Sequence, residues 1–355
     1  MRVALVSFTK TGAHMCRRIE IGLAAGKHLC MAYGMETYAE EAGILPLKGS
    51  LALWTKDAFA TSEALVFVGA CGIAVRTIAP YIKDKTVDPA VVVVDEIGKY
   101  AISLLSGHIG GANDLALEIA WIIGAMPVIT TATDLNKKFA VDDWAQRNNL
   151  WLGEMQTAKE ISVGVLNGQV IGFSSDYPIE GRLPEQLRYE TNGRDLTIGF
   201  MLSIYENKKP FKRTLHLVPK TVTIGMGCKK GISLDAAEAL LHKVLKEQGI
   251  SIHAIEKLCS IDIKKEEEAL NQLAQKLRVP FEVFPAQELA QVEGEFTTSD
   301  FVHSVTGVNN VSERAAILGS NGRLIIRKQI LNGVTLALAI RDENYQWNIK
   351  TDYED

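Results

Sequence analysis

The sequence predicts an α/β protein whose amino-terminal part forms a doubly wound, mostly parallel sheet. Three observations support this fold class: apolar runs of strand length alternate with helical segments, glycine-rich turns follow several of these runs, and the alternation continues through residue 129. A length of 355 residues is enough for two to three domains. We expect an amino-terminal α/β domain (1–139), a small α+β middle linker domain (140–219) and a carboxy-terminal α/β domain with a mixed sheet (220–355).

The elements of the amino-terminal domain follow from apolar runs and helical spacing. Strands are predicted over residues 2–7, 29–33, 64–68, 90–94 and 100–105, and helices over 13–25, 53–61, 73–78 and 112–123. In parallel sheets, ligands bind beyond the carboxyl ends of the strands. We therefore expect the loops at Phe8, Gly69, Ser106 and Thr130 to share one edge of the sheet.

The remaining elements are predicted in the same way. In the middle domain we expect a helix over 157–166 and strands over 169–173, 196–204 and 214–218. In the last domain we expect strands over 222–225, 257–261, 281–284, 323–328 and 334–340, a glycine-rich loop over 226–232, a helix capped by Ser233, and helices over 264–277 and after residue 314. The polar tail from residue 342 is expected to fray.

Composition excludes several classes of protein. Lys and Arg number 38 against 42 Asp and Glu, a net charge of −4, so no electrostatic footprint for nucleic acid is present. No apolar run approaches the ~20 residues of a membrane helix, and the first residues are typical of a strand rather than a signal peptide. Five scattered cysteines without a CxxC pair favour free thiols in a reducing cytoplasm, and no zinc-site spacing is present.

The most informative stretch is the glycine-rich segment Ser106-Gly107-His108-Ile109-Gly110-Gly111-Ala112-Asn113-Asp114. It lies between a predicted strand and a predicted helix, where backbone N–H groups and the positive end of the helix dipole favour an anion. His108 is the one side chain of this segment that titrates near neutral pH. We expect any chemistry to be centred here.

Three stretches resemble the CbiG family of cobalamin-biosynthesis proteins, the cobalt-precorrin-5A hydrolases of the anaerobic pathway. They are Gly69-Ala70-Cys71-Gly72-Ile73-Ala74-Val75-Arg76, the Ser106–Asn113 stretch, and Thr306-Gly307-Val308-Asn309-Asn310-Val311-Ser312-Glu313-Arg314. The loop Gly225-Met226-Gly227-Cys228-Lys229-Lys230-Gly231 is also similar, although arginine is commoner in the family at the position of Lys229. The resemblance covers all but the middle domain and the tail.

The resemblance implies a concrete reaction. The substrate would be a cobalt-bearing corrinoid with a δ-lactone between a ring-A acetate and the carbon bridging rings A and D. Hydrolysis would open the lactone, and the two-carbon bridging unit would leave as acetaldehyde, giving cobalt-precorrin-5B. The family resemblance implies no cofactor, since cobalt is carried by the substrate, and we expect no metal site in the protein.

For the catalytic groups, we expect His108 to act as general base and the N–H groups of Gly110, Gly111 and Ala112 to form an oxyanion hole. Alternatively, His108 caps the helix or binds a substrate acetate. Asp114 either orients His108 or complements the helix dipole. Asp95, Glu96 and Asp134 are alternative bases, or else solvated loop acids. Cys71 is either a nucleophile or a small buried residue.

Substrate binding is expected to need cations, because a corrinoid carries many carboxylates. Arg76, Lys229, Lys230 and Arg314 are the best candidates, and Lys10 is a weaker one. Asn309, Asn310 and Glu313 either bind an edge of the macrocycle or hold their loop. The remaining predicted binding residues are Gly72, Ser106, Gly107, Gly110, Gly111, Asn113 and Gly227. We expect His14, His28, His216, His242, His253 and His303 to be structural.

Two further hypotheses stay open at this stage. A non-catalytic carrier would bind the corrinoid without converting it, and a flavodoxin-like redox protein is suggested by Thr9-Lys10-Thr11-Gly12. The expected partner is the small-molecule cobalt corrinoid, with neither nucleic acid nor membrane. Transient contact with neighbouring pathway enzymes and a homodimer are left open.

Overall fold

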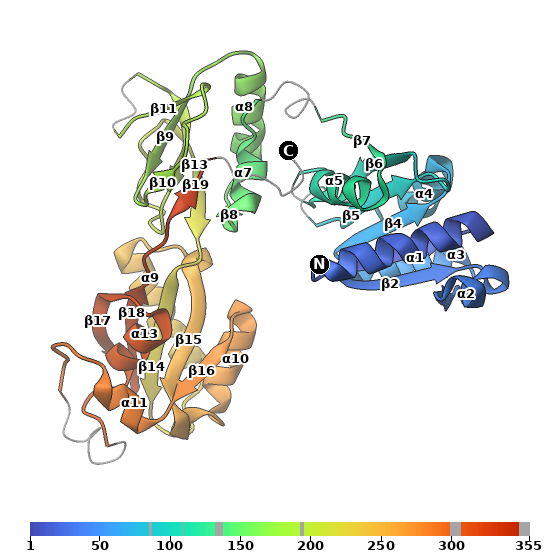
Figure 1. Cartoon of the computed structure of the whole chain (residues 1–355). Coiled ribbons are helices and arrows are strands. Elements are labelled where there is room, and N and C mark those ends of the chain that lie inside the picture. Colours follow the sequence, from blue (N-terminus) through green and yellow to red (C-terminus); the bar gives the residue numbers. More distant parts are fainter. Residues whose placement is uncertain (85–86, 109, 132–137, 192–194, 299–306, 348–355) are drawn as a thin grey trace. The chain divides into compact units, whose positions relative to one another are not determined.

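The structure is a computed structural model that describes residues 1–84, 87–108, 110–131, 138–191, 195–298 and 307–347 (Figure 1). The chain divides into two compact units, and it passes from the first to the second between residues 146 and 147. The predicted domain boundaries after residues 139 and 219 remain a prediction. Within the described residues, no helix has the length and apolar character needed to cross a membrane.

A seven-stranded sheet forms the centre of the first unit, in the order β3-β2-β1-β4-β5-β6-β7. Its strands are β1 (Arg2–Ser7), β2 (Leu29–Gly34), β3 (Leu45–Pro46), β4 (Ala64–Val68), β5 (Ala90–Val94), β6 (Tyr100–Leu105) and β7 (Met126–Val128). All neighbours pair in parallel except β5 and β6. This sheet and the mixed sheet of the second unit confirm the predicted fold class.

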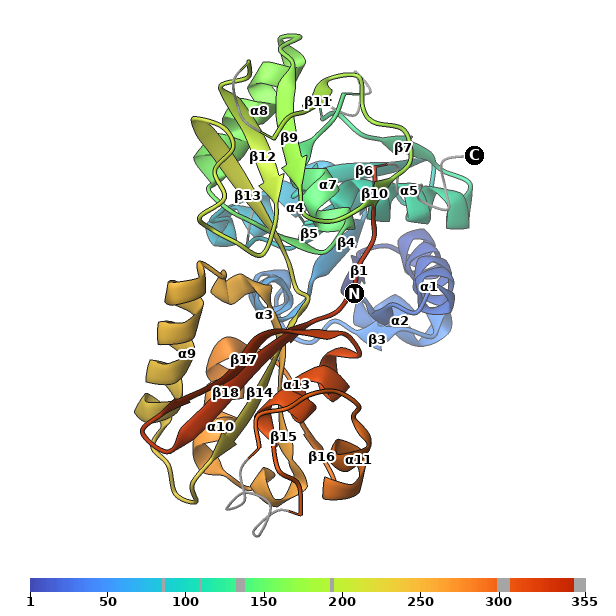
Figure 2. The same ribbon diagram turned by 90° about the vertical axis from the view of Figure 1, so that its left-hand side faces the viewer.

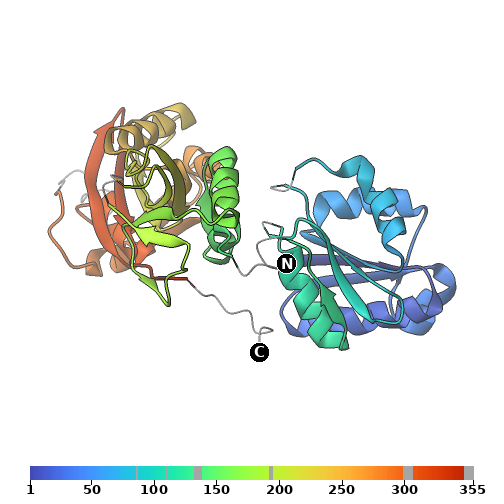
Figure 3. The same ribbon diagram turned by 90° about the horizontal axis from the view of Figure 1, so that it is seen from above.

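Helices cover both faces of this sheet (Figure 3). They are α1 (Lys10–Ala25), α2 (Glu36–Ala42), α3 (Leu51–Thr61), α4 (Cys71–Ile78) and α5 (Ala112–Ile123), with α7 (Val141–Arg147) at the end of the unit. Strand side chains alternate between the faces. Val3 and Leu5 pack with α1 and α5, whereas Ala4 and Val6 pack with α3 and α4. Both faces are buried, so the central strands read as continuous apolar runs.

The reversed strand β6 overturns one prediction. Val94 of β5 pairs with Ala101, and Val91 pairs with Leu105, so β6 runs back toward the amino ends of β4 and β5. The loops at Phe8 and Gly69 lie at one edge of the sheet, and the loops at Ser106 and Thr130 lie at the opposite edge. A five-residue strand such as β5 separates these edges by about 15 Å. The expected single row of four loops is therefore wrong.

Other differences from the predicted elements have local causes. Helix α1 begins at Lys10 rather than residue 13, because the Thr9 hydroxyl accepts a hydrogen bond from Gly12 N at 3.0 Å and caps the helix. Lys10 therefore lies in the helix, not in a loop. Helix α5 has the bounds that its apolar spacing predicted. The predicted base Asp134 lies outside the described residues, as do Ile109, His303 and Thr306.

The second unit begins with a five-stranded sheet in the order β11-β9-β12-β13-β8. Its elements are β8 (Leu150–Leu152), α8 (Met155–Leu166), β9 (Ile171–Ser175), β11 (Leu187–Tyr189), β12 (Ile198–Leu202) and β13 (Arg213–Pro219). The expected α+β character is present. The short strand β8 was not predicted, and it pairs antiparallel with β13.

The second sheet of this unit is mixed, in the order β16-β15-β14-β18-β17 (Figure 2). Its strands are β14 (Val222–Cys228), β15 (Ile255–Ile261), β16 (Phe281–Phe284), β17 (Arg323–Leu331) and β18 (Val334–Ile340). The accompanying helices are α9 (Leu234–Gln248), α10 (Glu268–Leu277), α11 (Ala286–Gln291) and α13 (Ser312–Ser320). Helices α9 and α10 pack with Ile224 and Met226 on one face, and α13 packs on the other.

Two predictions in this sheet need correction. Strand β14 continues through Cys228, because residues 222–228 pair continuously with β18, so the predicted loop starts three residues later. The part of the tail that the structure describes, residues 342–347, does not fray. Strand β19 (Tyr345–Gln346) pairs with β10 (Ile179–Glu180), and Tyr345 and Trp347 are buried.

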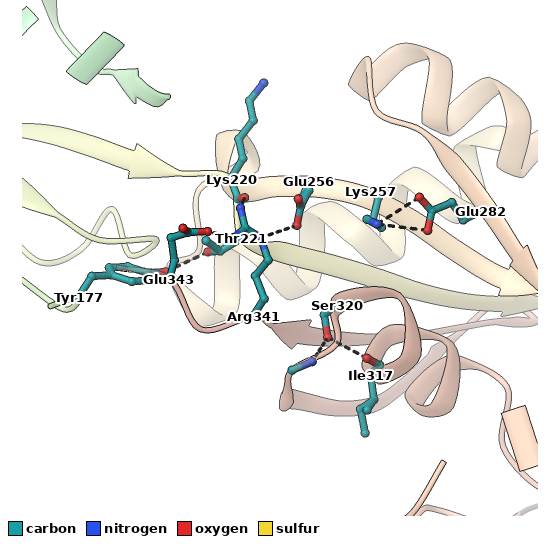
Figure 4. A network of polar contacts seen from close by, with 11 residues as sticks. Tyr177, Lys220, Thr221, Glu256, Lys257, Glu282, Ile317, Ser320, Arg341 and Glu343 are labelled. Atoms are coloured by element: carbon teal, nitrogen blue, oxygen red, sulfur yellow. Dashed lines mark hydrogen bonds and ion pairs between the residues drawn. The ribbon is translucent and has the colours of Figure 1, made fainter. Parts of the chain in front are cut away.

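Polar contacts join the two sheets of the second unit (Figure 4). The Tyr177 hydroxyl lies 2.9 Å from Thr221 Oγ1. Arg341, at the end of β18, forms ion pairs with Glu256, at 3.0 Å, and with Glu343. It also donates a hydrogen bond from Nη2 to the Lys220 carbonyl at 3.2 Å. The tail is thus fixed where the chain passes from one sheet to the other.

Candidate functional site: a histidine loop and a lysine-lined pocket

The His108 loop of the first unit is folded by its own backbone and by glycine. Ala112 N donates to Ser106 O at 3.1 Å, Asn113 N to Gly107 O at 3.0 Å, and Gly111 N to His108 O at 2.8 Å. A Cβ atom at Gly110 would lie 2.3 Å from Ser106 Cβ, so this close turn excludes any larger residue. The loop is a tight cap on the start of α5.

This folding corrects the expected oxyanion hole. The N–H groups of Gly111 and Ala112 are already bonded to loop carbonyls. Such donors stabilise an oxyanion only when they point at the position where it forms. Gly110 and Gly111 therefore allow the close turn before α5, and the predicted oxyanion hole of three N–H donors is not present in this conformation.

His108 lies beside a carboxylate that sequence spacing did not identify. Its Nδ1 is 3.8 Å from Asp142 Oδ1, and the two side chains are only 16% and 8% exposed. This distance is longer than a hydrogen bond, but the pair has the arrangement in which a carboxylate orients an imidazole. With Nδ1–H facing Asp142, Nε2 is left as the proton acceptor.

Asp142 belongs to the first turn of α7, and no motif in the sequence linked it to His108. The predicted orienting residue, Asp114, lies half-buried in the first turn of α5, where an acid complements the helix dipole. Because Asp142 is separated from His108 by more than thirty residues and a different helix, no local spacing could have revealed the pair.

Ser106 and Asn113 form the inner side of the same loop. Asn113 accepts a hydrogen bond from Ser103 Oγ at 2.7 Å and donates to Thr131 Oγ1 at 3.1 Å, so its amide holds β6 against the Thr131 segment. Ser106 has a φ of 57°, which is uncommon for serine, and among the described residues its buried Oγ has no hydrogen-bond partner. The loop thus holds strain and one unsatisfied hydroxyl.

Gly72 and Arg76 lie at the other edge of the sheet, on α4. Arg76 is exposed, and a Cβ at Gly72 would lie 3.4 Å from its guanidinium. Cys71 begins the same helix and is half-buried. At this edge Glu96 accepts a hydrogen bond from Thr9 Oγ1 at 2.7 Å, and Asp95 accepts from Tyr100 N. The structure separates these residues from His108 by the length of the sheet.

The second unit contains a pocket of about 970 Å³ at the carboxyl ends of β14 and β15. It brings together four of the predicted binding residues: Gly227, Lys229, Lys230 and Asn310. Lining residues that sequence analysis did not single out include Ile263, Lys264, Glu267, Lys328 and Ile330. These come from segments far apart in the chain, so only folding assembles them. Burial raises the pKa of the Cys228 thiol at the pocket wall, which favours the thiol over the thiolate.

The loop before α13 is held by buried polar groups. Glu313 has no exposed surface, and its carboxylate accepts hydrogen bonds from Thr297 N (3.0 Å), Asn310 Nδ2 (2.7 Å) and Lys328 N (2.8 Å). Asn310 Oδ1 in turn accepts from Glu313 N at 2.9 Å. Of the two alternatives for Asn310 and Glu313, the structure favours holding the loop.

Arg314 is also engaged within the protein. Its Nη1 donates to the carbonyls of Leu289 and Val292, both at 2.8 Å, and its guanidinium lies 4.3 Å from the Phe296 ring centre. Asn309 Oδ1 accepts from Arg314 Nη2 at 3.4 Å. Arg314 thus fastens α11 to α13, and it does not line the pocket.

Among the described side chains, no group of three or more His, Cys, Asp or Glu residues could hold a metal ion. The predicted metal-free character of the protein stays a prediction. The arrangement offers instead a histidine–carboxylate pair suited to proton transfer and, separately, a large pocket with lysines at its wall.

Comparison with known proteins places the chain among proteins of vitamin B12 synthesis. Family models described as Cobalamin synthesis G N-terminal and Cobalamin synthesis G C-terminus match residues 53–134 and 222–339. The cobalt-precorrin-5A hydrolase of Salmonella typhimurium is 37% identical over 350 residues, which cover 95% of this chain and 97% of the relative. That of Priestia megaterium is 32% identical, covering 95% and 94%.

A crystal structure of a cobalamin biosynthesis protein G homologue from Sulfolobus solfataricus is 22% identical to the chain. It matches with a TM-score of 0.43, covering 96% of this chain and 97% of that one.

Proposed function

The chain belongs to the cobalamin synthesis G family, and from this premise we propose that it hydrolyses cobalt-precorrin-5A to cobalt-precorrin-5B and acetaldehyde. The observation that carries the proposal is the identity of 37% across nearly the full length of both chains, to a relative with that name. The match spans both units, so the similarity to this relative extends over the whole chain and is not limited to a single domain.

The reaction needs a base at two points. Water adds to the lactone carbonyl and loses a proton, and the acyl C–O bond breaks to give a carboxylate and a hydroxyl on the bridging carbon. That hydroxyl then loses its proton as the C–C bond to the macrocycle breaks. The bridging unit leaves as acetaldehyde, and the electron pair of the broken bond passes into the macrocycle.

We assign the proton transfers to His108. A neutral imidazole is a suitable base near neutral pH, and Nε2 can take the proton from water while Nδ1–H faces Asp142. The Asp142 carboxylate stabilises the imidazolium that forms, and the imidazolium can return its proton later in the cycle. The low exposure of both side chains strengthens their interaction by excluding water.

The proposal places the reaction in the cytoplasm. All five cysteines are free thiols, a state that persists in a reducing compartment. The proposed partner is the cobalt corrinoid itself, whose metal belongs to the substrate. Transient contact with neighbouring pathway enzymes and dimerisation stay open.

The test is an anaerobic incubation of the full chain with cobalt-precorrin-5A, followed by quantification of acetaldehyde and of the absorption spectrum of the pigment. We expect stoichiometric acetaldehyde and repeated turnover when substrate exceeds protein. Binding of the pigment without any acetaldehyde would instead support the non-catalytic carrier. A yellow flavin retained after purification would support the redox protein.

A further inference from the structure

The pocket of the second unit has two chemically different walls. One is formed by Lys229 and by residues of the β17–β18 hairpin, including Lys328 and Ile330. The other is formed by residues 263–268, with the carboxylates of Glu266, Glu267 and Glu268. The two walls are joined by the carboxyl ends of β14 and β15. A ligand in this space meets cations on one side and acids on the other.

Three lysines that line the pocket form no ion pair with a carboxylate of the described residues. Within the described residues, no Asp or Glu oxygen lies in ion-pair distance of the amines of Lys229, Lys230 or Lys328. Lys264, by contrast, is neutralised by Glu267 at 2.8 Å, and Glu268 accepts a hydrogen bond from Gln272. Three cations therefore remain available to an anionic ligand.

Apolar side chains are exposed beside these cations. Ile263 and Ile330, one on each wall, are 59% and 64% exposed although both line the pocket. Large exposed aliphatic groups at the mouth of a concave site are typical of a binding surface that a ligand covers. Val311 and Ile261 add buried apolar surface deeper in.

The volume restricts the class of ligand further. About 970 Å³ lies at the upper end of the range for small-molecule sites and is large enough for a macrocycle. A flat apolar body would fit between the isoleucines, and carboxylates along one edge would reach the lysines. The opposite, acidic wall would repel carboxylates, and so it would fix which edge of the ligand enters on which side.

We infer that this pocket binds a polycarboxylate tetrapyrrole by one carboxylated edge, with Lys229 and Lys328 as its principal contacts. The inference rests on the proposed function only for the identity of the natural ligand, and it adds to that function a binding site in the second unit. It also assigns roles to Lys328, Ile263 and Ile330, which no sequence motif indicated.

The experiment is equilibrium dialysis of the full chain against cobyrinic acid, a cobalt corrin with free side-chain carboxyls, and against its methyl ester. The variants are Lys229→Gln, Lys328→Gln and Ile330→Asp. The control is Lys243→Gln, which removes an exposed lysine of α9 in the same unit. We expect each lysine variant to bind the acid about three- to tenfold more weakly, because each loses one charge-assisted contact.

Further arms make the test specific. Ile330→Asp places a negative charge at the mouth, so it should weaken binding of the acid more than that of the ester. Raising the salt concentration should weaken acid binding in the wild type and have less effect on the ester. Equal affinity of the lysine variants and the Lys243 control would overturn the inference, as would equal binding of acid and ester by the wild type.

Acetaldehyde release from cobalt-precorrin-5A by the same proteins separates this inference from the proposed function. If the wild type binds cobyrinic acid through the lysines but releases no acetaldehyde, the inferred binding pocket is supported and the proposed hydrolase activity is contradicted. If the wild type converts cobalt-precorrin-5A, and the lysine variants bind and convert it like the control, the proposed hydrolase activity is supported and the inferred binding pocket is contradicted.

Discussion

Two glycine-containing loops, each preceding a helix, differ in how their polar groups are used. In the loop before α5, His108 Nδ1 lies 3.8 Å from the Asp142 carboxylate, and Ser106 Oγ has no hydrogen-bond partner within the described part of the chain. In the loop before α13, Glu313 and Asn310 are fully buried and bonded to each other and to Thr297. The first loop places a histidine beside a carboxylate, an arrangement suited to proton transfer, whereas the second uses its polar groups for stability.

The comparison teaches that similar motifs need not share a role. Both stretches resemble family motifs, and both carry polar residues next to glycine at a helix start. What distinguishes them is which groups their side chains contact, and this is a property of the folded chain. Four predictions, from the largest expected effect to the smallest, test this distinction.

Glu313→Ala should lower the free energy of unfolding by about 3–5 kcal/mol, because it removes a fully buried acceptor and leaves the buried amide of Asn310 and the N–H groups of Thr297 and Lys328 without it. Urea denaturation of the second unit measures the loss, and Glu293→Ala, an exposed acid of the same segment, is the control. If the loop is structural, the protein that remains folded should keep its turnover. If the Glu313→Ala variant unfolded at the same urea concentration as the wild type, the structural role of the loop before α13 would be contradicted.

His108→Ala should lower turnover of cobalt-precorrin-5A by about 100-fold or more, since it removes the general base, while pigment binding persists. Acetaldehyde production under saturating substrate measures turnover, and His14→Ala, an exposed histidine of the same unit, is the control. Unchanged turnover would remove His108 from the mechanism and direct attention to Asp114 and Asp134.

Asp142→Asn should lower kcat by about tenfold, which corresponds to ~1.4 kcal/mol of transition-state stabilisation. The carboxylate favours the protonated imidazole, so its loss should move the acid limb of the kcat/KM profile to lower pH. If the role of Asp142 were purely structural, its replacement would change kcat without moving the acid limb of the kcat/KM profile. Asp143→Asn, one residue away in the same helical turn, is the matched control and should leave the profile in place.

Glu267→Gln should have the smallest effect, a loss of stability that is present near neutral pH and absent at acidic pH. Burial alone would raise the pKa of Glu267, but the hydrogen bonds from Lys264 and Gly231 outweigh it and lower the pKa. The folded state therefore binds fewer protons, and the stabilisation is present above the unfolded pKa of ~4.3 and is lost as pH falls through the folded value. The difference in urea midpoint between wild type and variant should disappear at the acid end; a constant difference would contradict this assignment.

Apolar periodicity alone determined much of the first unit. The bounds of β1, β4, β5, β6 and α5 agree with the sequence pattern, because strands buried on both faces and an amphipathic helix leave clear apolar signatures. The His108 loop could also be located from the chain, since glycines followed by a helix mark a close turn. The family itself was recognisable from three short motifs.

Tertiary structure alone decided the rest. Whether β6 runs parallel or antiparallel depends on how it pairs with β5, and no residue of β6 indicates this direction. The reversed direction nevertheless decides that His108 and Arg76 lie at opposite edges of the sheet. The approach of Asp142 to His108, and of Lys328 to Lys229, joins residues remote in the chain. Local sequence sets which conformations a segment prefers, but only the closed fold determines which distant side chains meet and which are left without a partner.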